Sequence, residues 1–279
     1  TINRDKASSS FGIRPFKRID NPIAETLSFA LCAFTGAVIV LPAASFLLIS
    51  IVQKYPIAMQ PTFDNFKRAF SMNTGTYLAN SLLISSFVSL LGSLSACILA
   101  YLTVRTRSKI SKPLHLCAIL TLAIPGLVLG LSYVLFFKGS FLYGTFAILI
   151  MVNMIHFFSS PYLMMYNTLG KLNPNLEIIG STMDIPRTKI IVDVILPQAK
   201  STVAEMAMYF FVNSMMTISA VSFLATTAIQ PVSLMIPSFE SQMLFECAGV
   251  VSLCILAVNL LIKALVIRYK KIVAQRDAA

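Results

Sequence analysis

Charged side chains are scarce in this sequence: Asp, Glu, Lys and Arg make up 12% of the 279 residues, whereas hydrophobic residues make up 57%. A soluble domain carries about 25% charged residues, so too little polar surface is left here to cover a globule in water. Apolar runs long enough to cross the ~30 Å hydrocarbon core of a bilayer recur along the chain. Because that core offers no water to unpaired backbone groups, each crossing segment must be a helix. The composition therefore predicts an all-α membrane protein.

Several kinds of functional motif are also missing. The five cysteines form no Cys-x-x-Cys pair or cysteine–histidine cluster, so they are read as small buried side chains and no metal site is expected. The first apolar stretch is too long for a signal peptide and lacks a small-residue cleavage pattern. No GxxxxGK[ST] pattern occurs, so the chain is not expected to hydrolyse ATP itself. The basic residues lie between apolar runs, which argues against nucleic acid as a partner.

The apolar runs predict six membrane-spanning helices, over residues 26–52, 78–104, 114–137, 143–169, 201–226 and 244–267. Pro125-Gly126 is expected to break the third of them. Residues 1–25 form a polar, basic tail or linker, residues 26–267 the membrane domain, and residues 268–279 a second tail. Since the chain starts at Thr1 without a methionine, we expect a fragment, a processed form or one half of a longer polypeptide.

Lysine and arginine are distributed unequally between the two sides of this predicted topology. Seventeen of the 22 lie in the two tails, the 105–113 loop and the long polar segment 170–200, and four lie in the loops of the opposite side. Basic residues in short loops stay in the cytoplasm. Both termini and residues 170–200 are therefore predicted to be cytoplasmic.

The 170–200 segment carries the clearest local signals. Asn173 suits a helix N-cap, Pro174 the first helical position and Glu177 the positive end of the helix. Because Pro186 disfavours a helical residue before it, this first helix is expected to end near Asp184. Four apolar residues recur along it at helical spacing and predict a stripe on one face: Leu172, Leu176, Ile179 and Met183.

A second helix is expected to run to about Leu196, where Pro197 should break the chain before the fifth span. The pattern leaves two readings of the apolar stripe open. A short exposed helix with an apolar stripe suits a groove on a partner protein. It suits equally a helix that lies flat on the membrane surface.

Residues 173–197 resemble the EAA loop of binding-protein-dependent ATP-binding-cassette (ABC) importer permeases. That pattern has Glu-Ala-Ala, a glycine six residues after the glutamate, an aliphatic residue ten further on, and then Leu-Pro. Aligned on Leu196-Pro197, the aliphatic residue falls on Val194 and the glycine position on Asp184. Glu-Ala-Ala falls on residues 178–180, and Glu177 lies one position before the usual acid.

Weaker similarities to the same family cover about residues 60–265. They lie at Thr62–Phe66, Asn80–Leu82, Ala100-Tyr101, Ile124–Gly130 and Leu142–Thr145. Within the family, the stretch Met216–Leu224 looks most like the second half of the double-length permeases for ferric iron and 2-aminoethylphosphonate.

The resemblance implies an ABC type I importer permease, or one half of it, in a bacterial inner membrane. Its partners would be membrane lipid, a second permease domain (a homologous half or a second copy), ATPase subunits that bind ATP-Mg, and a periplasmic binding protein that delivers a small solute. No cofactor is expected on this chain. The 170–200 segment would be a cytoplasmic coupling loop, and the residues implied in ATPase coupling are Leu172, Leu176, Glu177, Ile179, Met183, Asp184 and Arg187.

Polar and helix-breaking residues inside the predicted spans are candidates to line the pathway: Pro125, Gly126, Asn153, His156, Asn213 and Thr217, with Ser214 and Ser219 nearby. Hydrogen bonds between helices, and packing kinks, are plainer explanations of the same residues. Glu205 and Lys263 lie about a turn inside their spans and are expected to reach the interface.

Two rival classes remain. A channel or membrane scaffold without ATP coupling gives no reason for the spacing in residues 173–197. An intramembrane enzyme would need a matched pair of catalytic groups at bilayer depth, and the lone His156 argues against that.

Overall fold

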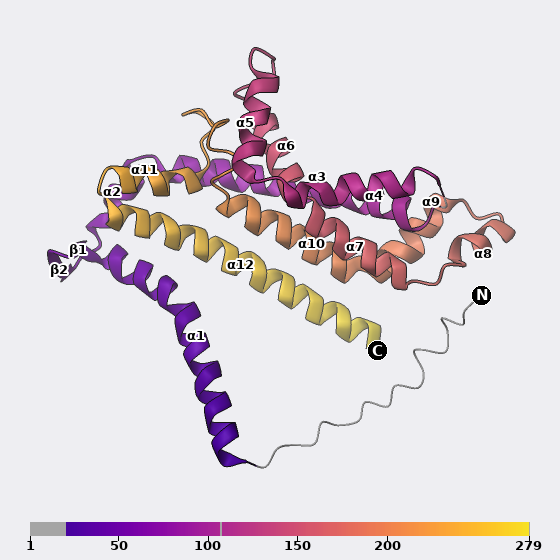
Figure 1. Cartoon of the computed structure of the whole chain (residues 1–279), viewed down its shortest axis with the longest axis horizontal. Coiled ribbons are helices and arrows are strands. Elements are labelled where there is room, and N and C mark those ends of the chain that lie inside the picture. The colour runs from indigo at the N-terminus through magenta and orange to yellow at the C-terminus, as the bar shows by residue number, and fades with distance from the viewer. Residues whose placement is uncertain (1–20, 107, 279) are drawn as a thin grey trace. The chain divides into compact units, whose positions relative to one another are not determined.

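A computed structural model describes residues 21–106 and 108–278 (Figure 1). Contacts between residues divide the chain into two units, Thr1–Ser45 and Phe46–Ala279. Residues 1–20 of the predicted tail over residues 1–25 lie outside the described residues.

The described part of the first unit is a single helix. It is most of α1 (Pro22–Ile51), a helix of 30 residues that is long and apolar enough to cross a membrane. Its large apolar side chains, among them Leu27, Phe34 and Leu41, are exposed. A helix that is apolar on all sides requires an apolar surrounding such as lipid.

The second unit is mostly helical, and it opens with a short antiparallel hairpin, so the all-α prediction was wrong in this place. Proline at positions 56 and 61 removes backbone donors and disfavours helix. The side-chain amide of Asn65 donates to the carbonyls of Ser50 (3.1 Å) and Val52 (2.7 Å) and holds the base of the hairpin. The elements up to the middle of the chain are β1 (Val52–Lys54), β2 (Ala58–Pro61), α2 (Asp64–Ser71), α3 (Thr74–Val104), α4 (Ser111–Leu120), η1 (Thr121–Ala123), α5 (Gly126–Phe137), α6 (Phe146–His156) and α7 (Ser159–Lys171).

The remaining elements follow a polar turn. They are α8 (Leu176–Thr182), α9 (Arg187–Ile190), the π-helical turn η2 (Ile191–Ile195), α10 (Leu196–Met216), η3 (Val232–Leu234), α11 (Met235–Ser241) and α12 (Phe245–Ala278). The predicted sixth span at 244–267 is confirmed as a helix, but it continues without a break through the predicted C-terminal tail.

Among the described residues, three helices are long and apolar enough to span a membrane: α1, α3 and residues 245–273 of α12. Two bent pairs raise the number to five if each pair counts as one span. The α4–α5 pair bends by 109° at the predicted Pro125-Gly126 break, and the α6–α7 pair bends by 54° at a break that the sequence analysis did not predict. The structure therefore supports three to five of the six predicted spans by length and composition.

The predicted fifth span differs at both ends. Pro197 was expected to break the chain, yet helical structure continues from α9 through η2 into α10. The backbone N–H of Leu196 donates to Ile191, five residues back, and this wider π-turn makes room for a proline that cannot donate to the preceding turn. At the other end, α10 stops at Met216 because Thr217 is extended (ψ 137°) and its carbonyl accepts from Ser233 Oγ at 2.6 Å.

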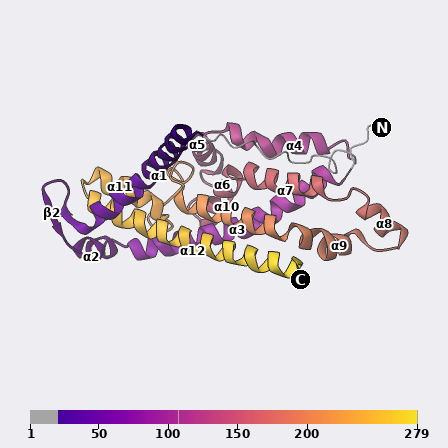
Figure 2. The same ribbon diagram turned by 90° about the horizontal axis from the view of Figure 1, so that it is seen from below.

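The core of the second unit forms around α3 and α10, which lie side by side with α6 and α7 against them (Figures 1 and 2). A methyl group at Gly92 of α3 would lie 2.8 Å from the ring of Phe210, which is fully buried on α10. Small residues allow such close helix packing where lipid supplies no hydrophobic driving force. A second cluster joins α2, α11 and the first half of α12.

Candidate functional site

The predicted coupling loop forms two short helices around a sharp turn, and its first helix is shorter than expected. Asn173 does not cap it. Instead, Asn173 Oδ1 accepts from the backbone of Asn175 at 2.9 Å, and α8 begins only at Leu176. The helix ends at Thr182, two residues before the predicted end.

Asp184 turns the chain out of α8 in the left-handed conformation, with a φ of 56°. The backbone N–H of Ile185 donates to Gly180 at 2.9 Å, and that of Asp184 donates to Ser181 at 3.4 Å. These two bonds form a Schellman motif, in which the left-handed residue is most often glycine. Asp184 is also the position that aligns with the glycine of the EAA pattern, and the backbone geometry explains why a glycine suits it.

The predicted apolar stripe divides between two surroundings. Leu172 and Leu176 are half-buried and pack against the core. Ile179 and Met183 are exposed, at 51% and 66%. Ile178, which the sequence analysis did not select, is 56% exposed beside them. We call Ile178, Ile179 and Met183 the outer patch.

The inner side of α8 is fixed to α9. Gly180 is buried, and a methyl group on it would come within 2.1 Å of Ile190 Cδ1. The outer patch is therefore presented by a helix whose opposite face is packed against the rest of the chain.

Glu177 lies in an ion pair with Arg105, which follows the last residue of α3. Two N–H groups of the guanidinium donate to the two carboxylate oxygens at 2.7 and 2.8 Å. Tyr101, one turn earlier on α3, is close enough to Glu177 and Arg187 to interact with their charges. The structure thus brings Glu177 to the end of α3, while Asp184 and Arg187 remain exposed. Arg105 was predicted only as a loop charge, although its place directly after a long apolar run was a usable signal.

Four of the six pathway candidates lie at the breaks of the two bent pairs. Pro125 precedes α5, and a methyl group on Gly126 would lie 2.3 Å from Ser219 Oγ and 2.9 Å from His156 Cε1. The start of α5, the end of α6 and the turn after α10 therefore meet at Gly126, His156 and Ser219, which we call the polar niche. Asn153 is one helical turn before His156.

Some buried polar atoms on α6 and α10 lack hydrogen-bond partners in the described part of the chain. Asn153 is 1% exposed, and neither atom of its side-chain amide is bonded. His156 Nδ1 and Ser214 Oγ are likewise buried without a partner. A buried polar group without a partner costs free energy, so such groups mark sites where water or a ligand can be accommodated.

The other two candidates lie apart from each other. Thr217 directly follows the last residue of α10, lies two residues before Ser219, and is almost completely buried. The Asn213 side chain donates to the backbone of Tyr209 at 2.8 Å and lines a cavity of about 320 Å³ between α10 and α12. Glu205 and Lys263 line that same cavity, and Glu205 pairs with Lys270 of α12.

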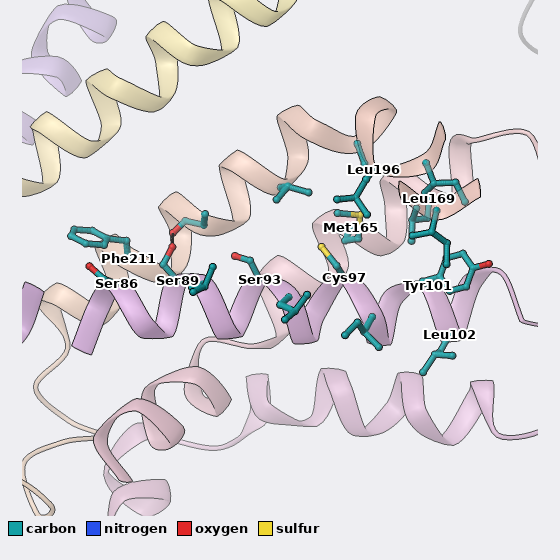
Figure 3. Close-up of a pocket in the computed structure, with 18 of the residues that line it drawn as sticks. Ser86, Ser89, Ser93, Cys97, Tyr101, Leu102, Met165, Leu169, Leu196 and Phe211 are labelled. Carbon is teal, nitrogen blue, oxygen red and sulfur yellow. Dashed lines mark hydrogen bonds between the residues drawn. The ribbon is translucent and has the colours of Figure 1, made fainter. Parts of the chain in front are cut away.

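A larger groove of about 730 Å³ lies along α3 and α10 (Figure 3). Its α3 side carries small side chains at helical spacing, Ser86, Ser89, Ser93 and Cys97, and most of its other lining is apolar. Ser89 Oγ donates across the groove to Ala207 at 2.7 Å. This groove was not predicted, although the row of small residues on one face of α3 was a signal for it.

Broken spans, a buried polar niche and a helix pair joined by a Schellman turn describe a helical membrane protein, and its fold is like that of ABC type I importer permeases. The fold is similar to that of a chain in the crystal structure of a bacterial ABC transporter involved in the import of the acidic polysaccharide alginate. The TM-score is 0.72 with 13% identity over 91% of this chain and 99% of that one. It is also similar to a chain of the inward-facing MetNI methionine ABC transporter, with a TM-score of 0.56 and 15% identity over 75% of this chain and 97% of that one.

Residues 88–276 match the family described as binding-protein-dependent transport system inner membrane component, and the chain belongs to that family. This confirms the resemblance read from residues 173–197 and the expectation of a non-catalytic permease component. Over 171 residues the chain is 27% identical to the ferric transport system permease protein FbpB of Actinobacillus pleuropneumoniae. That match covers 59% of this chain and 25% of the relative, so the chain spans only a quarter of the relative's length.

Proposed function

We propose that this chain is the permease subunit, or one permease half, of an ATP-driven importer that passes a small solute across the bacterial inner membrane. The observation that carries the proposal is the outer patch on α8. Its apolar side chains are exposed, while the Schellman turn and the packing of Gly180 on Ile190 hold the helix in place.

A groove on an ATPase subunit suits the outer patch better than a membrane surface does. Helices that lie on membranes are rich in lysine and arginine. The sequence of α8, from Leu176 to Thr182, holds one charged residue, Glu177, and no basic one. An apolar face on a short fixed helix with no basic residue of its own matches helix-in-groove recognition.

Comparing two matched substitutions tests this coupling role. Ile179→Asp places a carboxylate in the outer patch, whereas Ser181→Asp places one at an exposed position about 200° around the same helix from Ile179. Burying an unpaired charge in a protein groove costs several kcal/mol, on the order of 3–5. An ATPase subunit should therefore copurify with wild type and Ser181→Asp, and not with Ile179→Asp.

The same assay separates the rival classes. If Ile179→Asp retains the ATPase, the outer patch is not the docking face. If the wild-type chain brings no ATPase at all, the alternative of a channel or scaffold without ATP coupling replaces the importer.

We further propose that α10 is the fifth of six spans and that residues 170–200 and both termini are cytoplasmic. Support comes from α10 lying along α3 in the core, and from seventeen of the 22 basic residues falling on the side of that segment. Glu205, the acidic residue within α10, is paired with Lys270, which lowers the cost of placing it near the membrane.

The solute pathway is proposed to pass the polar niche. The unpaired amide of Asn153 and the imidazole of His156 offer hydrogen bonds there. Among the described residues no group of three or more His, Cys, Asp or Glu side chains could hold a metal ion, so selection of the solute would rest mainly with a periplasmic binding protein.

Ferric iron is the solute favoured by the name of the A. pleuropneumoniae relative, and a phosphonate remains the second candidate from the 216–224 stretch. Uptake of radioactive ferric iron and of labelled 2-aminoethylphosphonate by vesicles carrying the full transporter distinguishes the two. Uptake of neither would remove both candidates and leave the permease role to the copurification assay.

A further inference from the structure

Arg105 joins α3 to the segment that leads into α8. Besides its two bonds to the Glu177 carboxylate, its guanidinium donates to the backbone carbonyls of Asn173 at 2.8 Å and Leu172 at 3.3 Å. The guanidinium has five N–H donors in a rigid planar fork. One side chain therefore holds both the turn before α8 and the first turn of α8 itself.

The pair is largely removed from solvent. The Arg105 side chain is 4% exposed and the Glu177 side chain 15%. Removing one partner of such a pair leaves a buried charge without compensation, which a protein tolerates poorly. Glu177 therefore has its carboxylate committed inside the chain, and it is not free to serve as a surface contact.

The chain itself connects α7 to α8 only through a short turn. Residues 172–175 lie outside any helix. The Arg105–Glu177 pair bridges 72 residues of sequence and ties α8 directly to the end of α3. The helix α3 in turn lines the 730 Å³ groove and packs against α6, α7 and α10.

We propose that Arg105 is a positioning residue that locks α8 to the end of α3, so that α8 and α3 move as one body. The source of this movement rests on the proposed function. An ATPase that displaces α8 also displaces α3 and the helices around the polar niche. Glu177 transmits force through Arg105 instead of contacting the ATPase.

The lock can be measured without any ATPase. Spin labels are placed at exposed Ser181 on α8 and exposed Ser108 after α3, in the full chain with its native cysteines replaced, and the chain is reconstituted in lipid nanodiscs. Wild type should give one narrow distance between the labels. Arg105→Gln should lose the single narrow distance, since a neutral amide cannot form the two-pronged ion pair.

Three variants keep the result interpretable. Lys109→Gln removes an exposed positive charge four residues away and should leave the distance narrow. Exchanging the charges, Arg105→Glu with Glu177→Arg, should restore a narrow distance. Arg105→Lys should restore it only in part, because an ammonium lacks the planar fork. If Arg105→Gln does not fold, Glu177→Gln, which keeps the shape and removes the charge, is judged by the same criterion.

A second measurement adds the ATPase and Mg-AMP-PNP. In wild type the distance should stay unchanged when the nucleotide is added, because α8 and α3 move together, whereas in Arg105→Gln it should shift because α8 moves alone. A narrow wild-type distance retained in both Arg105→Gln and Glu177→Gln overturns the lock. A wild-type chain that binds no ATPase overturns the proposed function, and the first measurement still decides the lock.

Discussion

A close approach of backbone to α5 at Gly130 makes a sharp test of how the broken spans pack. A methyl group on Gly130 would lie 2.6 Å from the carbonyl oxygen of Ala220 and 3.3 Å from its carbon. Ordinary contacts of such a carbon begin at 3.4 Å. Both partners are backbone atoms and Ala220 is completely buried, so no side-chain rotation relieves the overlap. Gly130→Ala must push α5 away from the segment after α10.

The size of the effect follows from two opposing contributions. Alanine in a helix is favoured over glycine by about 1 kcal/mol. Overpacking in a well-packed core costs about 1–3 kcal/mol. Gly170 in α7 is the matched control, because nothing lies within 4 Å of a methyl group placed there. Gly170→Ala should therefore show only the helix gain, and the difference in unfolding free energy between the two variants should be the clash, about 1–3 kcal/mol.

Both variants and wild type are unfolded from mixed micelles with increasing SDS, and helix content is followed by circular dichroism. Gly130→Ala should unfold at a lower SDS fraction than Gly170→Ala. Equal midpoints would show that α5 and the 217–231 segment do not approach as the structure places them, and the polar niche would lose one of its walls.

Three further predictions concern the turn, the orientation and the niche. Asp184→Gly should keep or raise the thermal stability, while Asp184→Val should lower the unfolding free energy by about 1–2 kcal/mol, because a β-branched residue tolerates a φ of 56° poorly; equal melting of the two would refute the left-handed turn. A single cysteine at Ser181 should react with a membrane-impermeant maleimide in inside-out vesicles and not in intact cells, and labelling in intact cells would reverse the proposed orientation. Asn153→Leu should raise the unfolding free energy by about 1–3 kcal/mol, because it removes a buried amide without a partner, and should slow solute uptake; a stabilised variant with unchanged uptake would remove Asn153 from the pathway.

Long uniform apolar runs were the most predictable part of the fold. The second predicted span, 78–104, is α3 with one further turn at its start, and the sixth begins within a residue of α12. Such runs have one low-energy form in lipid, so hydropathy alone specifies them. The Pro125-Gly126 break was predictable for a similar reason, because proline acts on the backbone locally.

The break between α6 and α7 was not predicted, although a local signal for it was present. Pro161, in the first turn of α7, cannot donate to the carbonyl of Phe157 and crowds it. Ser159 Oγ donates to the carbonyl of Ala118 on α4 at 2.6 Å, a contact between residues 41 positions apart. This tertiary bond leaves no periodic signal, and the run from 143 to 169 was predicted as one straight helix from its hydropathy alone, without weighing Pro161.

In the coupling loop, too, the local features were predictable and the long-range contacts were not. The turn at Pro186 and the helical spacing before it were visible in the sequence, because both are local. The sequence did not indicate which residues of the stripe face outward, since Leu176 packs against the core while Ile179 stays exposed. The partner of Glu177 also lay beyond pattern reasoning, because Arg105 reaches it only through the fold.

The three interruptions of the spans bear on where a solute can pass. Each one, at Pro125, at Phe157 and at Thr217, frees backbone groups that a continuous helix would bond, and in lipid such groups cost several kcal/mol each. Non-helical backbone at membrane depth is tolerated only inside protein or beside water. Two of the freed regions are served by serine hydroxyls, Ser159 to Ala118 and Ser233 to Thr217, at 2.6 Å each. The amide of Asn153 and Nδ1 of His156 have no such partner among the described residues; His156 lies where the interruptions meet, and Asn153 lies one helical turn before it on α6. Water or a hydrated solute is the remaining source of those bonds, which is the physical reason for routing the proposed pathway through the polar niche.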